Sequence, residues 1–146
     1  MHEDWASLDK LLDREDHHSF DFVFVSGDQA NGENVIGELA DPAANQVHEA
    51  SNRRIMETLQ VMLKSQDTGK VLYIPGNHDA EILFKPEEQV PINDNCVNLH
   101  GKVLEIAPGL VIAGLGGSLP TLFKQDGASD FVECFTPYPF ASEAHY

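Results

Sequence analysis

The sequence predicts an α/β fold in which a strand–helix–strand unit is followed by antiparallel strands. Two segments rich in β-branched and aromatic residues, 20–25 and 71–74, favour buried strands. The long connection between them carries an apolar stripe at helical spacing, as a crossover between parallel strands requires. Three short strand-like segments separated by glycine turns follow at 96–100, 102–106 and 110–113. They indicate a change to antiparallel pairing.

Two helices are expected around these strands. The first begins near the start of the chain, where Asp4 is a suitable N-cap. Its apolar residues at helical spacing are Trp5, Leu8, Leu11 and Leu12. The second begins at Asp41-Pro42 and its apolar stripe continues to about residue 66. A short helical piece is expected at 80–84, whereas residues 119–146 have little periodicity and predict no element.

Length and charge limit the possible functions. The 146 residues fit one domain, and a hydrophobic content of 42% is enough to form a core. The chain has 24 acidic and 9 basic residues and a formal net charge of −15. Nucleic-acid backbones and anionic membranes repel such a chain, so neither duplex nucleic acid nor a membrane is expected as a partner. A phosphate substrate would need positive charge from another source, and metal ions are the obvious one.

The cysteine pattern and the lack of membrane or secretion signals in the sequence bear on where in the cell the protein is found. Cys96 and Cys134 are far apart and form no C-x-x-C pattern, which is typical of free thiols rather than a disulfide framework. The sequence has no apolar run of membrane length and no signal peptide. We therefore expect an intracellular, cytoplasmic protein.

Polar side chains follow the second predicted strand at once, in the run Gly76-Asn77-His78-Asp79. Sheets of α/β proteins carry their ligands at the carboxyl ends of strands, where this run is placed. The Asn77 amide oxygen can bind a hard cation, and the His78 imidazole can move a proton. The Asp79 carboxylate can orient that imidazole. The run therefore predicts a chemical site rather than an ordinary turn.

The first predicted strand ends in a similar way, at Gly27-Asp28. If the two strands lie side by side in a parallel sheet, Asp28 and Asn77 project into one crevice. An aspartate can bridge two divalent cations because each of its oxygens can bind one. Two cations about 3.5–4 Å apart can clamp a phosphoryl group and lower the pKa of a bridging water. His78 could then protonate the leaving group.

Gly27-Asp28 and Gly76-Asn77-His78-Asp79 resemble two signature blocks of the calcineurin-like metallophosphoesterases. This resemblance implies phosphoester hydrolysis on a β-sandwich flanked by helices, with two divalent ions (Mn, Fe, Zn or similar). It implies that Asp28 bridges the metals and that Asn77 binds one of them. It also implies that His78 acts on the substrate phosphate or leaving group, aided by Asp79. The strand and glycine segment at 112–118 is similar to one that follows in many members.

The sequence also departs from that family pattern. The family begins with Asp-x-His after a first strand, and here His2 stands where that histidine would be, so the resemblance implies a metal-ligand role for His2. The aspartate, the first strand and a later Gly-His-x-His block do not occur, so residues 1–146 are expected to form an incomplete domain. His100 precedes Gly101 between two short strands and is interpreted as a turn histidine rather than a ligand.

Two functions are compatible with these features. The first is a metal-dependent phosphoester hydrolase in which a metal-activated water attacks phosphorus. The alternative is a truncated or non-catalytic binding module on the same fold, which the missing ligands would favour. The segment 114–118 is interpreted as a flexible turn near the site and not as a phosphate-binding loop, because no Walker lysine is present. The sequence identifies neither the substrate nor the metal nor a protein partner.

Overall fold

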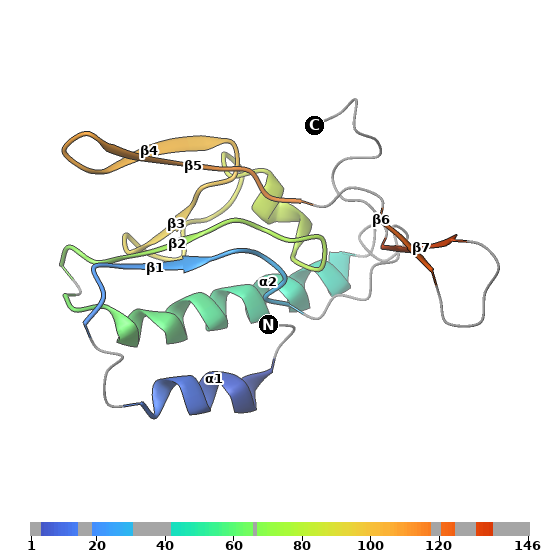
Figure 1. Ribbon diagram of the computed structural model, residues 1–146, viewed down its shortest axis with the longest axis horizontal. Helices are drawn as coiled ribbons and strands as arrows, with labels where there is room; N and C mark the ends of the chain where they lie inside the picture. Colours follow the sequence, from blue (N-terminus) through green and yellow to red (C-terminus); the bar gives the residue numbers. More distant parts are fainter. Residues whose placement is uncertain are drawn as a thin grey trace.

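The protein is built around a three-stranded parallel sheet, with two helices on one face and a β-hairpin on the other (Figure 1). A computed structural model provides the coordinates. It describes residues 4–14, 19–30, 42–65, 67–117, 121–124 and 131–135. In these ranges, no helix is long and apolar enough to cross a membrane.

The parallel sheet has the strand order β1-β2-β3. β1 (Phe22–Val25) pairs with β2 (Lys70–Tyr73), and β2 pairs with β3 (Cys96–Asn98). The parallel pairing of the first two strands confirms the sequence prediction. Antiparallel pairing begins one strand later than expected, because the connection after β2 is long enough to return the chain for another parallel strand.

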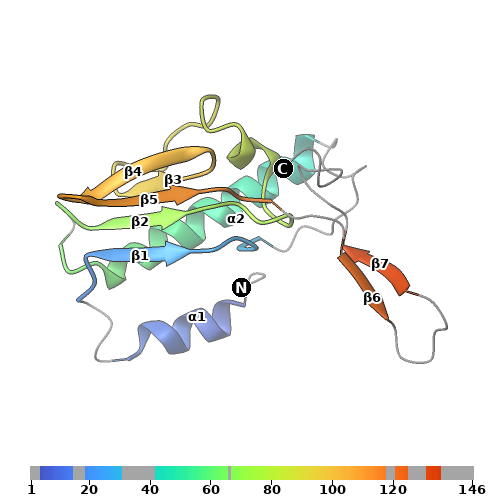
Figure 2. The ribbon, with the colours of Figure 1, turned by 45° about the horizontal axis from the view of Figure 1, so that its top comes forward.

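Helices α1 (Trp5–Leu12) and α2 (Pro42–Leu59) cover the same face of this sheet (Figure 2). Asp4 caps α1 as expected, since its carboxylate accepts from the Ser7 backbone N–H at 3.0 Å. The predicted N-cap of α2, Asp41, lies outside the described residues. The side chains that form the core between helices and sheet include Leu8, Ile55, Met56, Leu59 and Val71.

α2 ends earlier than the sequence predicted. Its last residue is Leu59, and a 3-10 turn, η1 (Gln60–Met62), follows it. Leu63 is then extended and forms a parallel bridge with Phe20, and the Lys64 backbone N–H donates to the Phe20 carbonyl at 2.7 Å. Pairing with the chain that leads into β1 therefore stops the helix, although its apolar periodicity continues.

The second face of the sheet meets an antiparallel hairpin of β4 (Lys102–Ala107) and β5 (Leu110–Gly114) (Figure 1). This hairpin is a separate two-stranded sheet. A 3-10 helix, η2 (Glu81–Phe84), occupies the expected short helical piece after β2. A further antiparallel pair, β6 (Thr121–Lys124) and β7 (Phe131–Phe135), lies where the sequence predicted no element.

Candidate functional site

The turns after β1 and β2 touch each other at the carboxyl edge of the parallel sheet. The Asp28 Oδ1 accepts from the His78 backbone N–H at 3.3 Å. A Cβ added to Gly76 would collide with the Asp28 carboxylate and backbone nitrogen, and one added to Gly27 would lie 2.7 Å from the Gly76 nitrogen. Only glycine at both positions permits this approach. The structure thus brings together the two turns that carry Asp28 and Asn77.

The backbone at Asp28 has an unusual conformation. Its φ is 55° and that of the preceding Gly27 is 96°, so two successive residues lie in the left-handed half of φ space. Aspartate adopts this region more readily than most residues, although it costs about 1–3 kcal/mol. The sharp turn directs the chain back across the end of β2, where Gly76 lies against it. Such strain is common at functional sites.

The Asp79 carboxylate is fully buried and joins three parts of the fold. Its Oδ1 accepts from the backbone N–H groups of Gln29 (2.7 Å) and Ala30 (2.8 Å) and from Asn52 Nδ2 (2.8 Å). Its Oδ2 accepts from the Gly76 backbone N–H at 2.7 Å. Burial raises the pKa of Asp79, and these four hydrogen bonds oppose the increase. Asp79 thereby fixes both strand-end turns relative to α2.

Two residues that the sequence analysis did not select, Gln29 and Asn52, complete this buried cluster. Their side chains are 0% and 1% exposed. Asn52 Oδ1 accepts from the Ala80 backbone N–H at 3.1 Å. With its amide oriented to match its neighbours, Gln29 donates to Asp79 Oδ2 and accepts from the Gly27 backbone N–H, both at 2.9 Å. In the sequence, Asn52 could have been noticed as a polar residue on the apolar stripe of α2, since a polar residue buried there needs hydrogen-bond partners.

Asn77 and His78 differ in their exposure to solvent. Asn77 is 5% exposed, and its Nδ2 has no hydrogen-bond partner among the described residues. A buried amide N–H without a partner suits an external acceptor such as a phosphoryl oxygen, because leaving it unpaired costs about 1–3 kcal/mol. His78 is partly exposed between two buried neighbours. Of the two side chains, His78 is therefore the more accessible to solvent.

The donors near the paired turns are suited to a hard divalent cation. The Asp28 carboxylate and the Asn77 amide both offer oxygen, which Mg²⁺ and Mn²⁺ prefer. Within the described ranges, no group of three or more His, Cys, Asp or Glu side chains is arranged to hold a metal ion. His2, the remaining predicted ligand, lies outside those ranges. The two oxygen donors fit a metal but do not by themselves complete its coordination.

The glycine segment lies against the end of β2, near the candidate site as the sequence predicted, but residues 114–117 are held by contacts rather than forming a loose turn. The Gly117 backbone N–H donates to the Pro75 carbonyl at 2.8 Å, directly before Gly76. A Cβ added to Gly116 would collide with the same carbonyl. The segment provides no phosphate cradle in the described residues, since it is committed to contacts with the end of β2.

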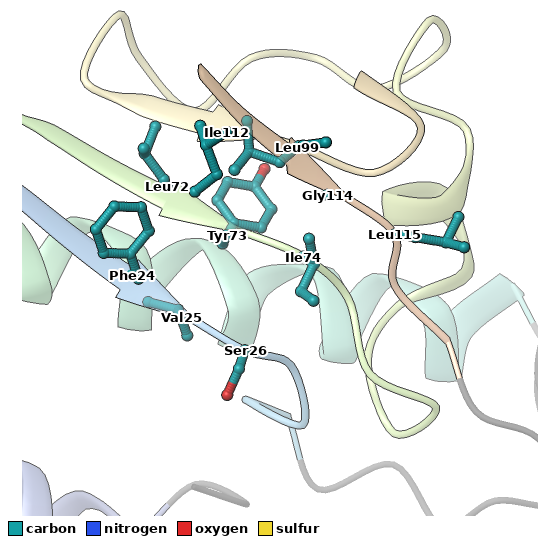
Figure 3. A pocket seen from close by; sticks show the side chains of 11 residues that line it. Phe24, Val25, Ser26, Leu72, Tyr73, Ile74, Leu99, Ile112, Gly114 and Leu115 are labelled. Atoms are coloured by element: carbon teal, nitrogen blue, oxygen red, sulfur yellow. The ribbon is translucent and has the colours of Figure 1, made fainter. Parts of the chain in front are cut away.

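An apolar cleft opens beside the site, between the parallel sheet and β5 (Figure 3). Its volume is about 270 Å³. It is lined by Phe24, Val25, Ser26, Leu72, Tyr73, Ile74, Leu99, Ile112, Ala113, Gly114 and Leu115. The polar groups of the candidate site belong to the strand-end turns and not to this cleft.

Comparisons with known proteins give one positive finding. A model of the calcineurin-like phosphoesterase family matches residues 1–143. The mixed α/β arrangement described above agrees with part of that family's fold. Neither the curated proteins nor the solved structures gave a match.

Proposed function

The chain belongs to the calcineurin-like phosphoesterase family, and from that premise we propose that it hydrolyses a phosphoester at the paired turns of Asp28 and Asn77. The family implies phosphoester substrates and generally uses divalent metal ions. One observation carries the proposal for this chain. The turn bearing Asp28 contacts the turn bearing Gly76 and Asn77, so two oxygen donors stand at one edge of the sheet.

Asp28 and Asn77 are the residues that would hold the metal, with His2 as a further predicted ligand. When bound, a pair of divalent ions such as Mn²⁺ supplies a water of lowered pKa and offsets the charge of the phosphoryl group. That supply of positive charge suits a chain whose formal net charge is −15. Asp28 would supply the negative charge that holds the metal, because its carboxylate lies at the contact between the turns.

The other residues of the turn have separate tasks in this proposal. The Asn77 Nδ2 donates to a phosphoryl oxygen, which gives a partner to its buried N–H. The partly exposed His78 donates a proton to the leaving-group oxygen. Asp79 positions both turns through its bonds to Gln29, Ala30 and Gly76. We assign it this positioning role because those bonds occupy its carboxylate, whereas the sequence suggested that it orients His78.

Mn²⁺-stimulated hydrolysis of a generic aryl phosphate tests the proposal. We expect Asp28→Asn to lower turnover about 100-fold or more, since it removes the negative charge that holds the metal. Asp9→Asn on the exposed side of α1 is the matched control and should leave turnover unchanged. Circular dichroism and Mn²⁺ titration calorimetry would verify the fold and the metal affinity of each variant. Undiminished turnover in a folded Asp28→Asn variant would refute this site.

The alternative is a non-catalytic binding module on the same fold. It is favoured by the lack of a group of three metal-ligating side chains in the described part of the chain. The same assay separates the two functions. A wild-type chain that binds Mn²⁺ but releases no phosphate above the uncatalysed rate would support the binding module.

A further inference from the structure

We propose that His100 is a positioning residue for the candidate site: its imidazole holds the glycine segment 114–117, and this segment holds the turn that carries Asn77. The catalytic consequence of this inference rests on the proposed function. Its structural part concerns only the chain itself and can be tested without any turnover. His100 itself touches none of the residues that we assign to metal or substrate in the described contacts.

The first contact joins His100 to the glycine segment. The Gly116 backbone N–H donates to His100 Nδ1 at 3.0 Å. The imidazole ring lies edge-on to Phe84, with 5.2 Å between ring centroids and an interplanar angle of 78°. The His100 backbone N–H donates to Asn98 Oδ1 at 3.0 Å. The ring is therefore held by Gly116 and Phe84 and the backbone by Asn98, and Nδ1 must be unprotonated to accept from Gly116.

The second contact joins the glycine segment to the end of β2. Gly117 donates its backbone N–H to the Pro75 carbonyl at 2.8 Å, and Gly116 lies so close to that carbonyl that a Cβ would collide with it. A Cβ on Gly114 would lie 2.8 Å from Ile74 Cγ2. Figure 3 shows Gly114 at the end of β5 and Leu115 on the chain that follows it, near Ile74. The segment is thus fitted closely to the last residues before the site.

The third contact belongs to the site itself. Pro75 is followed by Gly76, whose backbone packs against Asp28, and then by Asn77. A shift of the glycine segment would therefore move Pro75 and change the distance between the two turns. In phosphoryl transfer a misplacement of about 1 Å can cost about 100-fold in rate. His100 acts through this series of contacts and not on the reacting atoms.

Protonation of His100 provides a way to interrupt these contacts. Burial lowers the pKa of His100 from its ordinary value of 6.5, and the charge of Glu87 opposes that shift. Of the elements against the ring, β5 has no titratable side chain, and η2 has Glu81, which pairs with Lys85 at 2.7 Å. The folded state favours the neutral acceptor form. The Gly116 bond is therefore present above pH 6.5 and is lost as pH falls through the lowered pKa.

Two substitutions distinguish the loss of the hydrogen-bond acceptor at position 100 from the protonation of His100. In His100→Asn, the amide oxygen can take the place of Nδ1 and accept from Gly116 without changing charge. In His100→Leu, the acceptor is removed at all pH values. The reporters are the backbone amide resonances of Gly116 and Asn77, followed by nuclear magnetic resonance from about pH 8 to about pH 5 on the whole chain. Gly109, at the far end of the hairpin, is the control reporter.

For the wild type we expect the Gly116 and Asn77 resonances to move together, with one midpoint below 6.5, while Gly109 stays constant. His100→Asn should abolish this pH response at Gly116, together with the part of the Asn77 response that shares the Gly116 midpoint. His100→Leu should displace both resonances at neutral pH. An Asn77 resonance that ignores both the titration and the substitution would overturn the inference. If His100→Leu does not fold, the comparison of wild type with His100→Asn still decides the question.

Turnover then tests the catalytic consequence. We expect kcat in His100→Asn to stay within about twofold of wild type at neutral pH and to fall less steeply than in wild type as the pH is lowered to about 5. In His100→Leu, kcat should fall about tenfold or more. A wild type without turnover, but with coupled Gly116 and Asn77 resonances, would refute the proposed function and leave the positioning role intact. Turnover that is equal in all three proteins across the pH range would refute that role.

Discussion

The polar cluster beneath the strand-end turns and the apolar cleft above the sheet are neighbouring regions that are held in different ways. In the polar cluster, Gln29, Asn52 and Asp79 are at most 1% exposed, and the carboxylate accepts bonds of 2.7–2.8 Å. In the cleft, Leu72 is 1% exposed, whereas Phe24, its paired residue on β1, is 56% exposed. One region is closed by its own residues and the other remains open on one side.

The difference shows what fixes the site. Hydrogen bonds are directional, so the bonds of Asp79 set the relative position of two turns and a helix. Apolar contact is not directional, so truncating a cleft side chain such as Leu72 leaves the hydrogen bonds of the turns in place. We therefore expect the geometry at Asp28 and Asn77 to depend on the polar cluster far more than on the cleft. Substitutions in the two regions can test this.

The largest effect is expected for Asp79→Ala. It would leave buried N–H donors of Gln29, Ala30 and Gly76 without an acceptor, and each stranded donor costs about 1–3 kcal/mol. We expect a loss of several kcal/mol in the free energy of unfolding, measured by urea denaturation, together with loss of Mn²⁺ binding. Asp9→Ala, at an exposed position of α1, is the control. An unchanged urea midpoint would show that the polar cluster does not hold the turns.

A smaller effect is expected for Leu72→Ala, at the floor of the cleft. Truncating a buried leucine costs about 2–5 kcal/mol through lost transfer energy and the cavity that remains. The same urea measurement would give this value. Because Leu72 makes no bond to the turns, Mn²⁺ affinity of the folded fraction should match wild type. A metal affinity that falls as far as in Asp79→Ala would mean that the two regions are coupled.

The smallest effect is expected for Phe24→Ser, on the open side of the same cleft. With Phe24 already 56% exposed, we expect the free energy of unfolding to change by less than about 1 kcal/mol. The substitution removes an exposed aromatic ring, so light scattering should report less self-association. Mn²⁺ affinity should again be unchanged. A loss as large as that of Leu72→Ala would show that Phe24 is covered in solution.

Much of the fold could be predicted because its signals are local. The strands at β1 and β2 follow from runs of β-branched and aromatic residues, and α1 follows from its cap and apolar spacing. The end of α2 at Leu59 could not be predicted, because bridging between Phe20 and Leu63 ends it against its own periodicity. The parallel pairing of β3 is likewise a long-range contact with β2. No local pattern revealed β6 and β7.

By itself, the sequence determined that each of two strands ends in a glycine turn with polar residues, because strand propensity and turn chemistry act over a few residues. The pairing of these strands then placed Asp28, Asn77 and His78 at one edge of the sheet. Only the tertiary structure decided which partners surround them. The Asp79 bond to Gln29 joins residues 50 positions apart, and His100 reaches Gly116 across a hairpin. Such contacts depend on how the elements approach one another, which short-range propensities do not specify.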